Sequence, residues 1–319
     1  MEIEQRNLGR TGLTVSLLGL GGGGNSRLGL SVGQDENHAA EVVRAGLDMG
    51  LTMLDTARGY GTERAVGLAL RGRKRDQVVV SSKSPYDDES ERLLSAQDFA
   101  QNLDTSLREL GLEWIDIYFI HGLAAESYAA VRERFLPVLQ QARQAGKIRF
   151  FGLTEQFEHD TRHEMLRLAL RDEDWDVFMV GHNLINPSAR ERVLAETRRR
   201  GIATLGMFAV RRGLIDPGWL RKLLRRLAQN GEVEPGLADQ ENLMAALGLE
   251  GVCETLAEAA YRFSVFAPGM DCVLSGTSSA AHLRQNLEAV RRGPLPPAAL
   301  ARLQELFGRI DSVSAQVRE

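Results

Sequence analysis

The sequence predicts an α/β fold in which residues 1–319 form a single (β/α)8 barrel of the TIM type. Three observations predict it. Short apolar runs take turns along the chain with segments of helical periodicity. Within each run the residues are apolar throughout, without the apolar-polar alternation of a half-exposed strand. No break in composition divides the chain. Strands buried on both faces are typical of a parallel sheet covered by helices, and eight strand-helix repeats favour a closed barrel over an open sheet.

The predicted barrel strands are 15–20, 52–55, 78–81, 115–121, 148–152, 177–180, 203–207 and 271–275. The segments with helical periodicity are 38–50, 63–71, 96–111, 128–146, 161–171, 189–201, 252–263 and 280–290. Several of these helices end at a glycine, which favours the left-handed backbone of a helix C-terminus.

Three segments lie outside the repeat. The stretch NLGRTGLTVS places a short turn, Gly9 to Gly12, between two strand-like pieces and predicts an N-terminal β-hairpin before the barrel. Residues from about 213 to 251 are too many for an ordinary βα loop, so we expect an insertion after strand seven that overhangs the mouth. The stretch PLPPAALARLQELFGRI predicts a closing helix that starts with proline.

Composition limits the partners. A formal net charge of -4 gives no electrostatic reason to expect nucleic acid or an anionic membrane, so a small molecule is the expected partner. Cys253 and Cys272 lack metal-binding spacing and are interpreted as reduced thiols. The N-terminal residues have no apolar core of a signal peptide, and no apolar run is long enough to span a bilayer. We therefore expect a cytoplasmic protein without a metal; the oligomeric state is left open.

A glycine-rich stretch, LLGLGGGGN, contains Gly19, Gly21 and Gly24 in the spacing of a dinucleotide-binding fingerprint. That fingerprint requires a helix to begin at its last glycine, whereas the next helical pattern begins only around Glu36. We interpret Gly21, Gly22 and their neighbours as a loop after the first barrel strand. Such a loop either lets a ligand approach the backbone or is an inert connection.

Four polar residues stand at the ends of three successive strands: Asp55 and Tyr60, then Lys83, then His121. Each has an ordinary structural explanation when taken alone, such as a helix cap, packing or a solvated charge. Together they predict a site, because the chemistry of such barrels gathers at the C-terminal ends of the strands.

A consistent chemistry unites these four residues. An ammonium beside a phenol favours the phenolate and lowers the pKa of the phenol, and a carboxylate keeps the ammonium in place. Asp55 would hold Lys83, Lys83 would activate Tyr60, and His121 would orient the reacting oxygen. We expect proton donation to a carbonyl oxygen as hydride arrives at carbon, or the reverse with an alcohol.

These stretches resemble the aldo-keto reductase family. The resemblance runs from NLGRTGLTVSLLGLG through LDTARGYGTERAVGLAL, VVVSSK, NLDTSLRELGLEWIDIYFIHG and GKIRFFGLTE to VLSGTSSAAHLRQNLEAV. It implies that Asp55, Tyr60, Lys83 and His121 are the family's catalytic tetrad. It also implies an enzyme that binds an extended NADP(H) or NAD(H) across the barrel mouth without a Rossmann domain.

The same resemblance implies the coenzyme contacts, with departures at the nicotinamide. Thr154 and Glu155 replace the family's usual Ser-Asn, and an ionised glutamate cannot donate a hydrogen bond. Met179 replaces a common glutamine, and Met207 replaces a stacking aromatic. A thioether packs on a ring but does not replace an amide donor.

The implied phosphate and adenine contacts follow the eighth strand. They are Gly276, Thr277, Ser278, Ser279, His282, Gln285 and Asn286. The alternative is that Thr277 or Ser278 only caps the helix. His282 stands where members that prefer NADP(H) often have arginine, and Gln285 replaces a commoner glutamate. The family favours NADP(H), with NAD(H) possible.

The substrate is expected to be a small carbonyl compound or alcohol. The branch with aldose and L-galactose dehydrogenases would imply oxidation at a sugar C1. Phe157, Phe208, Trp219 and Tyr86 are candidate pocket walls. Two other classes stay open. One is a cofactor-binding regulatory barrel with little turnover. The other is a metal-dependent hydrolase or glycosidase, although the first strand has no His-x-His and Glu155 has no evident partner.

Overall fold

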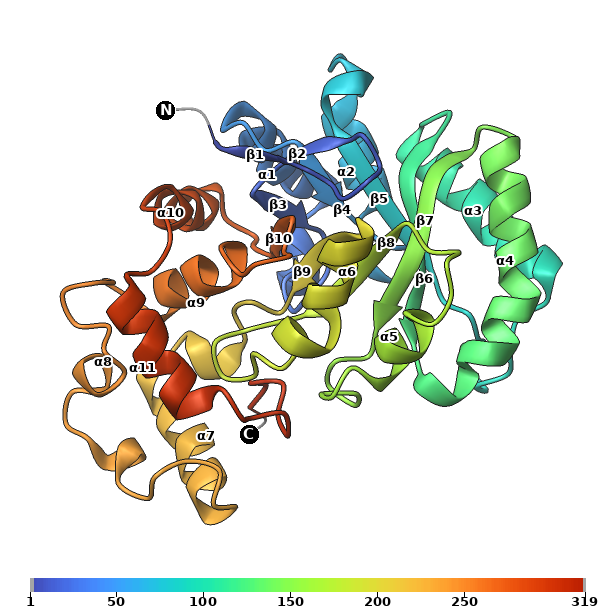
Figure 1. The fold of residues 1–319 in the computed structure, drawn as a ribbon. Helices are drawn as coiled ribbons and strands as arrows, with labels where there is room; N and C mark the ends of the chain where they lie inside the picture. Colours follow the sequence, from blue (N-terminus) through green and yellow to red (C-terminus); the bar gives the residue numbers. More distant parts are fainter. Residues whose placement is uncertain (1–2, 318–319) are drawn as a thin grey trace.

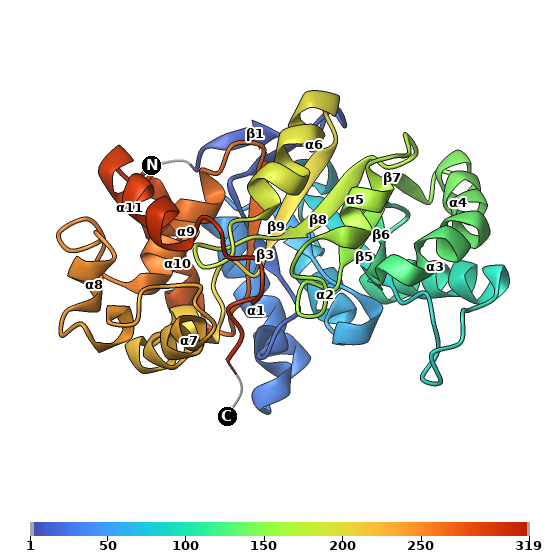
Figure 2. The same cartoon turned by 60° about the horizontal axis from the view of Figure 1, so that its bottom comes forward.

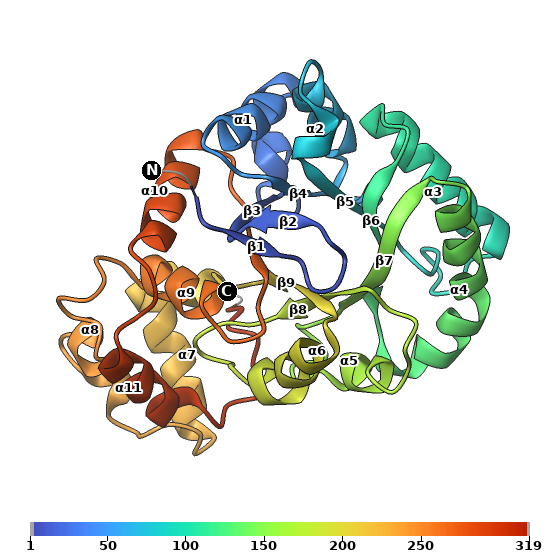
Figure 3. The same cartoon turned by 45° about the horizontal axis from the view of Figure 1, so that its top comes forward.

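The structure, a computed structural model, describes residues 3–317 and contains a closed barrel of parallel strands (Figures 1 and 3). The barrel strands, in chain order, are β3 Leu18–Gly21, β4 Met53–Asp55, β5 Val79–Ser84, β6 Ile115–Leu123, β7 Ile148–Glu155, β8 Val177–Gly181, β9 Ala203–Met207 and β10 Cys272–Ser275. β10 pairs with both β9 and β3, which closes the barrel. The predicted fold class is therefore confirmed.

The helices cover the outside of the barrel. They are α1 Glu36–Asp48, α2 Glu63–Leu70, α3 Ala96–Leu110, α4 Tyr128–Gln144, α5 Glu164–Ala169, α6 Ala195–Arg200, α9 Leu256–Val265 and α10 Ala280–Arg291. The predicted helix at 38–50 begins two residues earlier, because the Asp35 side chain accepts a hydrogen bond from the backbone N–H of His38. The helix predicted at 189–201 starts with a π-helical turn, Arg190–Leu194, before α6. None of the helices in residues 3–317 is long and apolar enough to cross a membrane.

The N-terminal hairpin consists of β1 Gln5–Asn7 and β2 Thr14–Ser16, paired antiparallel as predicted. The first predicted barrel strand was wrong at its start, because Val15 pairs with Arg6 in this hairpin and β3 begins only at Leu18. The carboxylate of Asp271 accepts hydrogen bonds from the backbone N–H groups of Gly9, at 3.1 Å, and Thr204, at 2.9 Å.

The hairpin closes one end of the barrel. Leu8, Leu13 and Val15 join a buried cluster with residues inside the barrel such as Ile117 and Phe119. Figure 3 shows the hairpin lying across this end, where the strands begin. The C-terminal ends of the strands therefore form the open mouth.

The predicted insertion contains α7 Pro217–Gln229 and the short α8 Leu243–Ala246. It packs with α9 and with the proline-started closing helix α11 Pro297–Phe307 into a second apolar cluster. Figures 1 and 2 show α7, α8 and α11 grouped on one side of the barrel, away from α3 and α4. Asp216 and Trp219, at the start of α7, line the cavity at the mouth, so the insertion reaches the mouth as predicted.

Close backbone packing between β7 and β8 gives a test of this architecture. A Cβ at Gly152 would lie 1.8 Å from the carbonyl oxygen of Val177, so the strands could not keep their register. We expect Gly152→Ala to lower the free energy of unfolding by about 1–3 kcal/mol or more, as overpacking does.

Urea unfolding measures this effect. The control is Gly236→Ala, where an added Cβ has no atom within 4 Å and the backbone needs no positive φ. The control should change stability by less than about 0.5 kcal/mol. Equal stability of the two variants would contradict the strand packing described here.

Candidate active site

The structure brings together the four polar residues predicted at the strand ends. Asp55 is the last residue of β4, and Tyr60 ends the short 3-10 turn Arg58–Tyr60 that follows it. Lys83 lies in the neighbouring β5 and His121 in β6, next to β5. Because parallel strands end at the same edge, these side chains meet at the mouth of the barrel.

A buried ion pair lies at the centre of this group. Lys83 Nζ lies 2.7 and 2.6 Å from the two carboxylate oxygens of Asp55, and it donates to the carbonyl oxygen of Thr56 at 2.9 Å. Ser81 Oγ also donates to Asp55, at 2.6 Å. Burial acts to lower the pKa of Lys83, but the charges of Asp55 and Tyr60 and the hydrogen bonds to both together outweigh it, and the pKa is raised. Lys83 therefore stays charged.

Tyr60 lies directly beside this pair. Lys83 Nζ is 4.8 Å from the centre of the Tyr60 ring, and Tyr60 Oη is 3.2 Å from His121 Nε2. Burial raises the pKa of Tyr60, and the charge of Lys83 opposes this without reversing it. The expected influence of the ammonium has the predicted sign, but the expected net lowering was wrong because burial dominates. Tyr60 is thus a protonated phenol at neutral pH.

His121 completes the arrangement as a neutral imidazole. Burial, followed by the nearby charge of Lys83, lowers the pKa of His121 to about 3. Its ring meets that of Tyr60 edge to face, with the ring centres 5.3 Å apart. A neutral imidazole can exchange a hydrogen bond with the phenol, or with an oxygen bound beside it, without adding a charge.

The glycine-rich loop after β3 packs against Tyr60. A Cβ at Gly23 would lie 2.6 Å from the Tyr60 ring, and one at Gly22 would lie 2.7 Å from Thr62 Oγ1. The backbone N–H of Gly22 also donates to the carbonyl oxygen of Asp55 at 2.7 Å. These glycines are needed for close packing around the phenol, which the sequence alone did not predict.

A cavity of about 1140 Å³ runs from Asp55 and Tyr60 across the mouth to α10. Of the predicted coenzyme-binding residues, those that line it are Gly21, Met179, Met207, Gly276, Thr277, Ser278, His282, Gln285 and Asn286. Gly22, Thr154, Glu155 and Ser279 are not among its lining residues. Of the candidate pocket walls, Phe208 and Trp219 line it, whereas Phe157 and Tyr86 do not.

Further residues that the sequence did not indicate line the same cavity. They are chiefly Asn25, Ser26, Arg211, Arg212, Ile215, Asp216, Glu254, Glu258, Glu288, Arg292 and Gln316. Most of them come from the insertion and from the C-terminal third of the chain. No local motif marks these positions, since only the packing of distant segments brings them to the mouth.

Another part of the cavity lies at the N-terminus of α10. Ser279 Oγ accepts from the backbone N–H of His282 at 3.4 Å, so Ser279 caps this helix rather than Thr277 or Ser278. Asn286 Nδ2 donates to Ser275 Oγ at 3.0 Å. Gly276, Thr277 and Ser278 of the loop before α10 line the cavity, and a loop that leads into a helix N-terminus suits phosphate.

Glu155 is turned away from the cavity. Both of its carboxylate oxygens lie 2.9 Å from His163 Nδ1, and one also accepts from the backbone N–H of Gly181 at 2.7 Å. The side chains of Glu155 and His163 are fully buried. His163 is the partner that the sequence did not reveal. Thr154 Oγ1 likewise accepts from the backbone N–H of Gly122 at 2.6 Å. These contacts join the ends of β6, β7 and β8.

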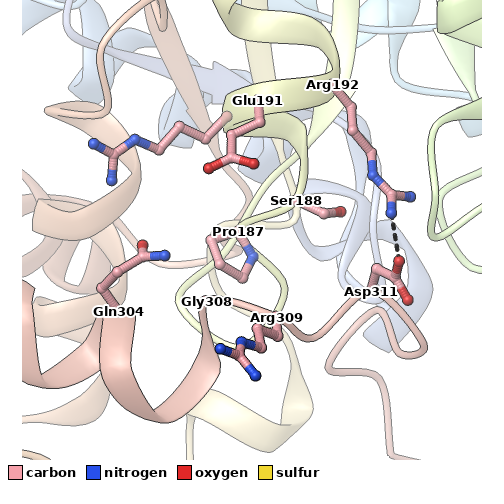
Figure 4. A pocket seen from close by; sticks show the side chains of 9 residues that line it. Pro187, Ser188, Glu191, Arg192, Gln304, Gly308, Arg309 and Asp311 are labelled. Atoms are coloured by element: carbon pink, nitrogen blue, oxygen red, sulfur yellow. Dashed lines mark hydrogen bonds and ion pairs between the residues drawn. The ribbon is translucent and has the colours of Figure 1, made fainter.

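A second, smaller cavity of about 290 Å³ lies elsewhere in the fold (Figure 4). It lies between the segment that starts at Pro187 and the end of α11, and an ion pair between Arg192 and Asp311 stands at one side of it. None of the four clustered strand-end residues lines this cavity. The mouth cavity is therefore the candidate active site.

Within residues 3–317, no group of three or more His, Cys, Asp or Glu side chains could hold a metal ion. The alternative of a metal-dependent hydrolase thus has no ligand set among the described residues. A large cavity lined by a phenol and by the loop at the N-terminus of α10 instead fits an oxidoreductase that uses a dinucleotide.

Comparison with known proteins supports this class. A model of the aldo/keto reductase family matches residues 18–307. L-galactose dehydrogenase from Arabidopsis thaliana is 26% identical, over 91% of this chain and 88% of its own. NADH-specific methylglyoxal reductase from Escherichia coli (strain K12) is 24% identical, over 89% and 92%.

Among solved structures, aldo-keto reductase AKR11C1 from Bacillus halodurans in its holo form matches with a TM-score of 0.73 and 24% identity. The match covers 96% of this chain and 97% of that one. The fold and site place the protein among the (β/α)8-barrel oxidoreductases. The chain belongs to the aldo/keto reductase family, and it is therefore an enzyme that uses a nicotinamide cofactor on small carbonyl compounds.

The position of Glu155 gives a second test. In Glu155→Gln the amide would turn an N–H toward the Nδ1 of His163 or leave Gly181 without an acceptor. We expect the free energy of unfolding to fall by about 1–3 kcal/mol, the cost of an unsatisfied buried group. Coenzyme affinity should change less than about twofold, a free-energy change of less than ~0.5 kcal/mol.

Thermal or urea unfolding, with a fluorescence titration of the coenzyme, separates the two effects. Glu164→Gln, at an exposed neighbouring carboxylate, is the control. A large loss of coenzyme affinity in a stably folded Glu155→Gln would show that Glu155 contacts the coenzyme instead.

Proposed function

We propose that Tyr60 transfers the proton in a hydride-transfer reaction between a nicotinamide dinucleotide and a carbonyl compound, and that Asp55, Lys83 and His121 set its properties. One observation carries this proposal. The Tyr60 hydroxyl lies between a buried ammonium and a neutral imidazole at the inner end of a large open cavity. A proton donor in this position can protonate the oxygen of a carbonyl bound in the mouth.

The three partners act in different ways. Lys83 stabilises the phenolate that remains after the proton leaves, and this stabilisation is strong because the pair is buried. Asp55 keeps Lys83 charged and fixed. His121 Nε2, close to Tyr60 Oη, orients the carbonyl oxygen of the substrate. The reduced nicotinamide supplies the hydride when it is bound, and the same groups run the reverse reaction on an alcohol.

The cavity has the extent and the donors for the coenzyme. Its lining residues include Tyr60, Arg211 and Arg212, and the loop before α10. NADP(H) and NAD(H) both contain the nicotinamide, the pyrophosphate and the adenosine that would occupy this cavity. The family resemblance favours NADP(H), whereas the Escherichia coli relative is named NADH-specific.

The substrate part of the mouth is mixed in character. Met207, Phe208 and Trp219 give it an apolar wall, while Asn25 and Ser26 add polar groups from the loop after β3. We infer a small carbonyl compound with an apolar portion, or its alcohol. The named activity of the Arabidopsis thaliana relative favours a second candidate, oxidation of a sugar at C1.

Replacing the phenol tests the proposal. We expect Tyr60→Phe to lower kcat for carbonyl reduction by about 10²–10⁴-fold, because the reaction loses its proton donor. Coenzyme affinity should stay within about twofold, ~0.4 kcal/mol. The measurements are the absorbance of the reduced nicotinamide during turnover with a panel of aldehydes and ketones, and a fluorescence titration of coenzyme binding.

Tyr128→Phe is the matched control, because it removes a phenol hydroxyl that donates to Asp172 on the outer helical layer. It should leave kcat unchanged. Full turnover by Tyr60→Phe would refute the proposed role of Tyr60. Coenzyme binding by the wild type without turnover in either direction would favour the regulatory-barrel alternative.

The pH profile tests the protonation states. Tyr60 has a raised pKa and His121 a pKa of about 3, so neither group titrates near neutrality. We expect kcat/KM for reduction to be flat from about pH 5 to 9 and to fall only at higher pH, where Tyr60 loses its proton.

Lys83→Met removes the charge that opposes the effect of burial, so the pKa of Tyr60 should rise further. The fall of kcat/KM at alkaline pH should then move to higher pH, and the plateau value of kcat/KM should be lower. Initial rates in buffers of constant ionic strength measure both profiles. If kcat/KM of the wild type changed near pH 6 to 7, and this change disappeared in His121→Gln, it would contradict the assignment of His121 as a neutral imidazole.

A further inference from the structure

The end of the mouth cavity farthest from Tyr60 is lined by α10 and by residues at the start of α9. One stripe of side chains, His282, Gln285 and Ala289 on α10 and Arg292 directly after it, lines the cavity. Hydride transfer requires the nicotinamide near Tyr60, so the adenosine of an extended dinucleotide lies at this distal end. NAD(H) and NADP(H) differ only there, by a phosphate on the adenosine ribose.

Carboxylates dominate this distal end. Glu254 and Glu258 line it from the start of α9, and Glu288 lines it from α10. Within the described part of the chain, no ion pair involves Glu288, which is exposed. An extra phosphate, carrying up to two negative charges, would be brought next to these groups.

The one guanidinium on the distal stripe is already engaged. Arg292 lies 2.7 Å from Glu254 Oε1 and 2.7 Å from Glu258 Oε2. The hydrogen bonds and charges of these two carboxylates raise the pKa of Arg292. Arg262 also pairs with Glu258, at 2.9 Å. The donors of Arg292 therefore point at carboxylates, and its charge is compensated.

His282 is the other basic side chain at this end. An imidazole offers one donor toward a phosphate, whereas a free guanidinium would offer a planar fork. A single contact of this kind does not offset the neighbouring carboxylates.

The loops after β9 and before α10 line another part of the cavity. Arg211 and Arg212 lie on the first loop, and Gly276 and Thr277 lie on the second. The Arg211 guanidinium pairs with Glu158, so its charge is also compensated. The helix N-terminus that follows Gly276 and Thr277 suits the pyrophosphate that both coenzymes contain. The groups that suit the shared phosphates are thus separate from the carboxylates, which lie where only NADP(H) has a phosphate.

We propose that Glu254 and Glu288 make this enzyme select NAD(H) and reject the additional phosphate of NADP(H), which reverses the preference that the family resemblance implies. This rests on the proposed function, because it takes the orientation of the coenzyme from the position of Tyr60. Glu254 acts by holding Arg292, and Glu288 acts by direct repulsion.

Binding measurements without turnover test the proposal. The dissociation constants of NADH and NADPH, and of ADP-ribose and its 2'-phosphate, are measured by calorimetry and by quenching of tryptophan fluorescence, since Trp219 lines the cavity. We expect the forms without the extra phosphate to bind about tenfold tighter or more at low salt. The ratio should shrink as the ionic strength rises.

Variants assign the effect to residues. Glu288→Gln and Glu254→Gln should each tighten the binding of NADPH several-fold and change that of NADH less than twofold, because they remove a repulsive charge and release one arm of Arg292. Glu191→Gln, which removes a carboxylate at the smaller cavity, is the control and should change neither.

The outcomes separate the two proposals. Equal or tighter binding of NADPH by the wild type, or variants that leave the ratio unchanged, would overturn the selection of NAD(H) and leave the role of Tyr60 intact. Binding of neither coenzyme would overturn the proposed function itself.

Discussion

The rest of the site depends on the buried pair of Lys83 and Asp55. A fully buried ammonium is costly unless a carboxylate and further acceptors surround it, and here Asp55 and the carbonyl of Thr56 do so. The pair fixes the end of β4 against β5 and places a permanent positive charge under the ring of Tyr60. Burial raises the pKa of the phenol, and this charge opposes the effect of burial without reversing it.

The two ends of the barrel are built for different tasks. The hairpin fills the end where strands begin, with Leu8 and Leu13 buried over the barrel interior. At the mouth, the loop after β3 is rich in glycine, and Gly23 leaves room for the Tyr60 ring. Glu155, at the end of β7, stabilises the barrel rather than lining the cavity, because its carboxylate accepts hydrogen bonds from His163 and from the backbone of Gly181. Among the charged residues that line the cavity, Arg211 pairs with Glu158, whereas Glu288 is exposed.

The sequence by itself determined the barrel, because the alternation of apolar runs and helical periods is a local property of the chain. It also determined which polar residues lie at or near the C-terminal ends of β4, β5 and β6, since that follows from strand order alone. It misplaced the start of the first barrel strand, because Val15 is apolar whether it pairs in a hairpin or in the barrel. The insertion was recognised only by its length, since its helices bury their apolar faces against α9 and α11.

Only the tertiary structure decided the distances between the groups of the site and the electrostatic environment of each group. The net pKa direction of Tyr60 depends on how deeply the ring is buried, which no spacing reveals. The engagement of Glu155 by His163 depends on the path of the loop between them, and that of Arg292 by Glu254 on the packing of α9 against α10. The sequence thus identifies the polar groups that cluster at the mouth, because they lie at or near strand ends. Folding sets their charges and neighbours, because burial and long-range contacts arise only in three dimensions.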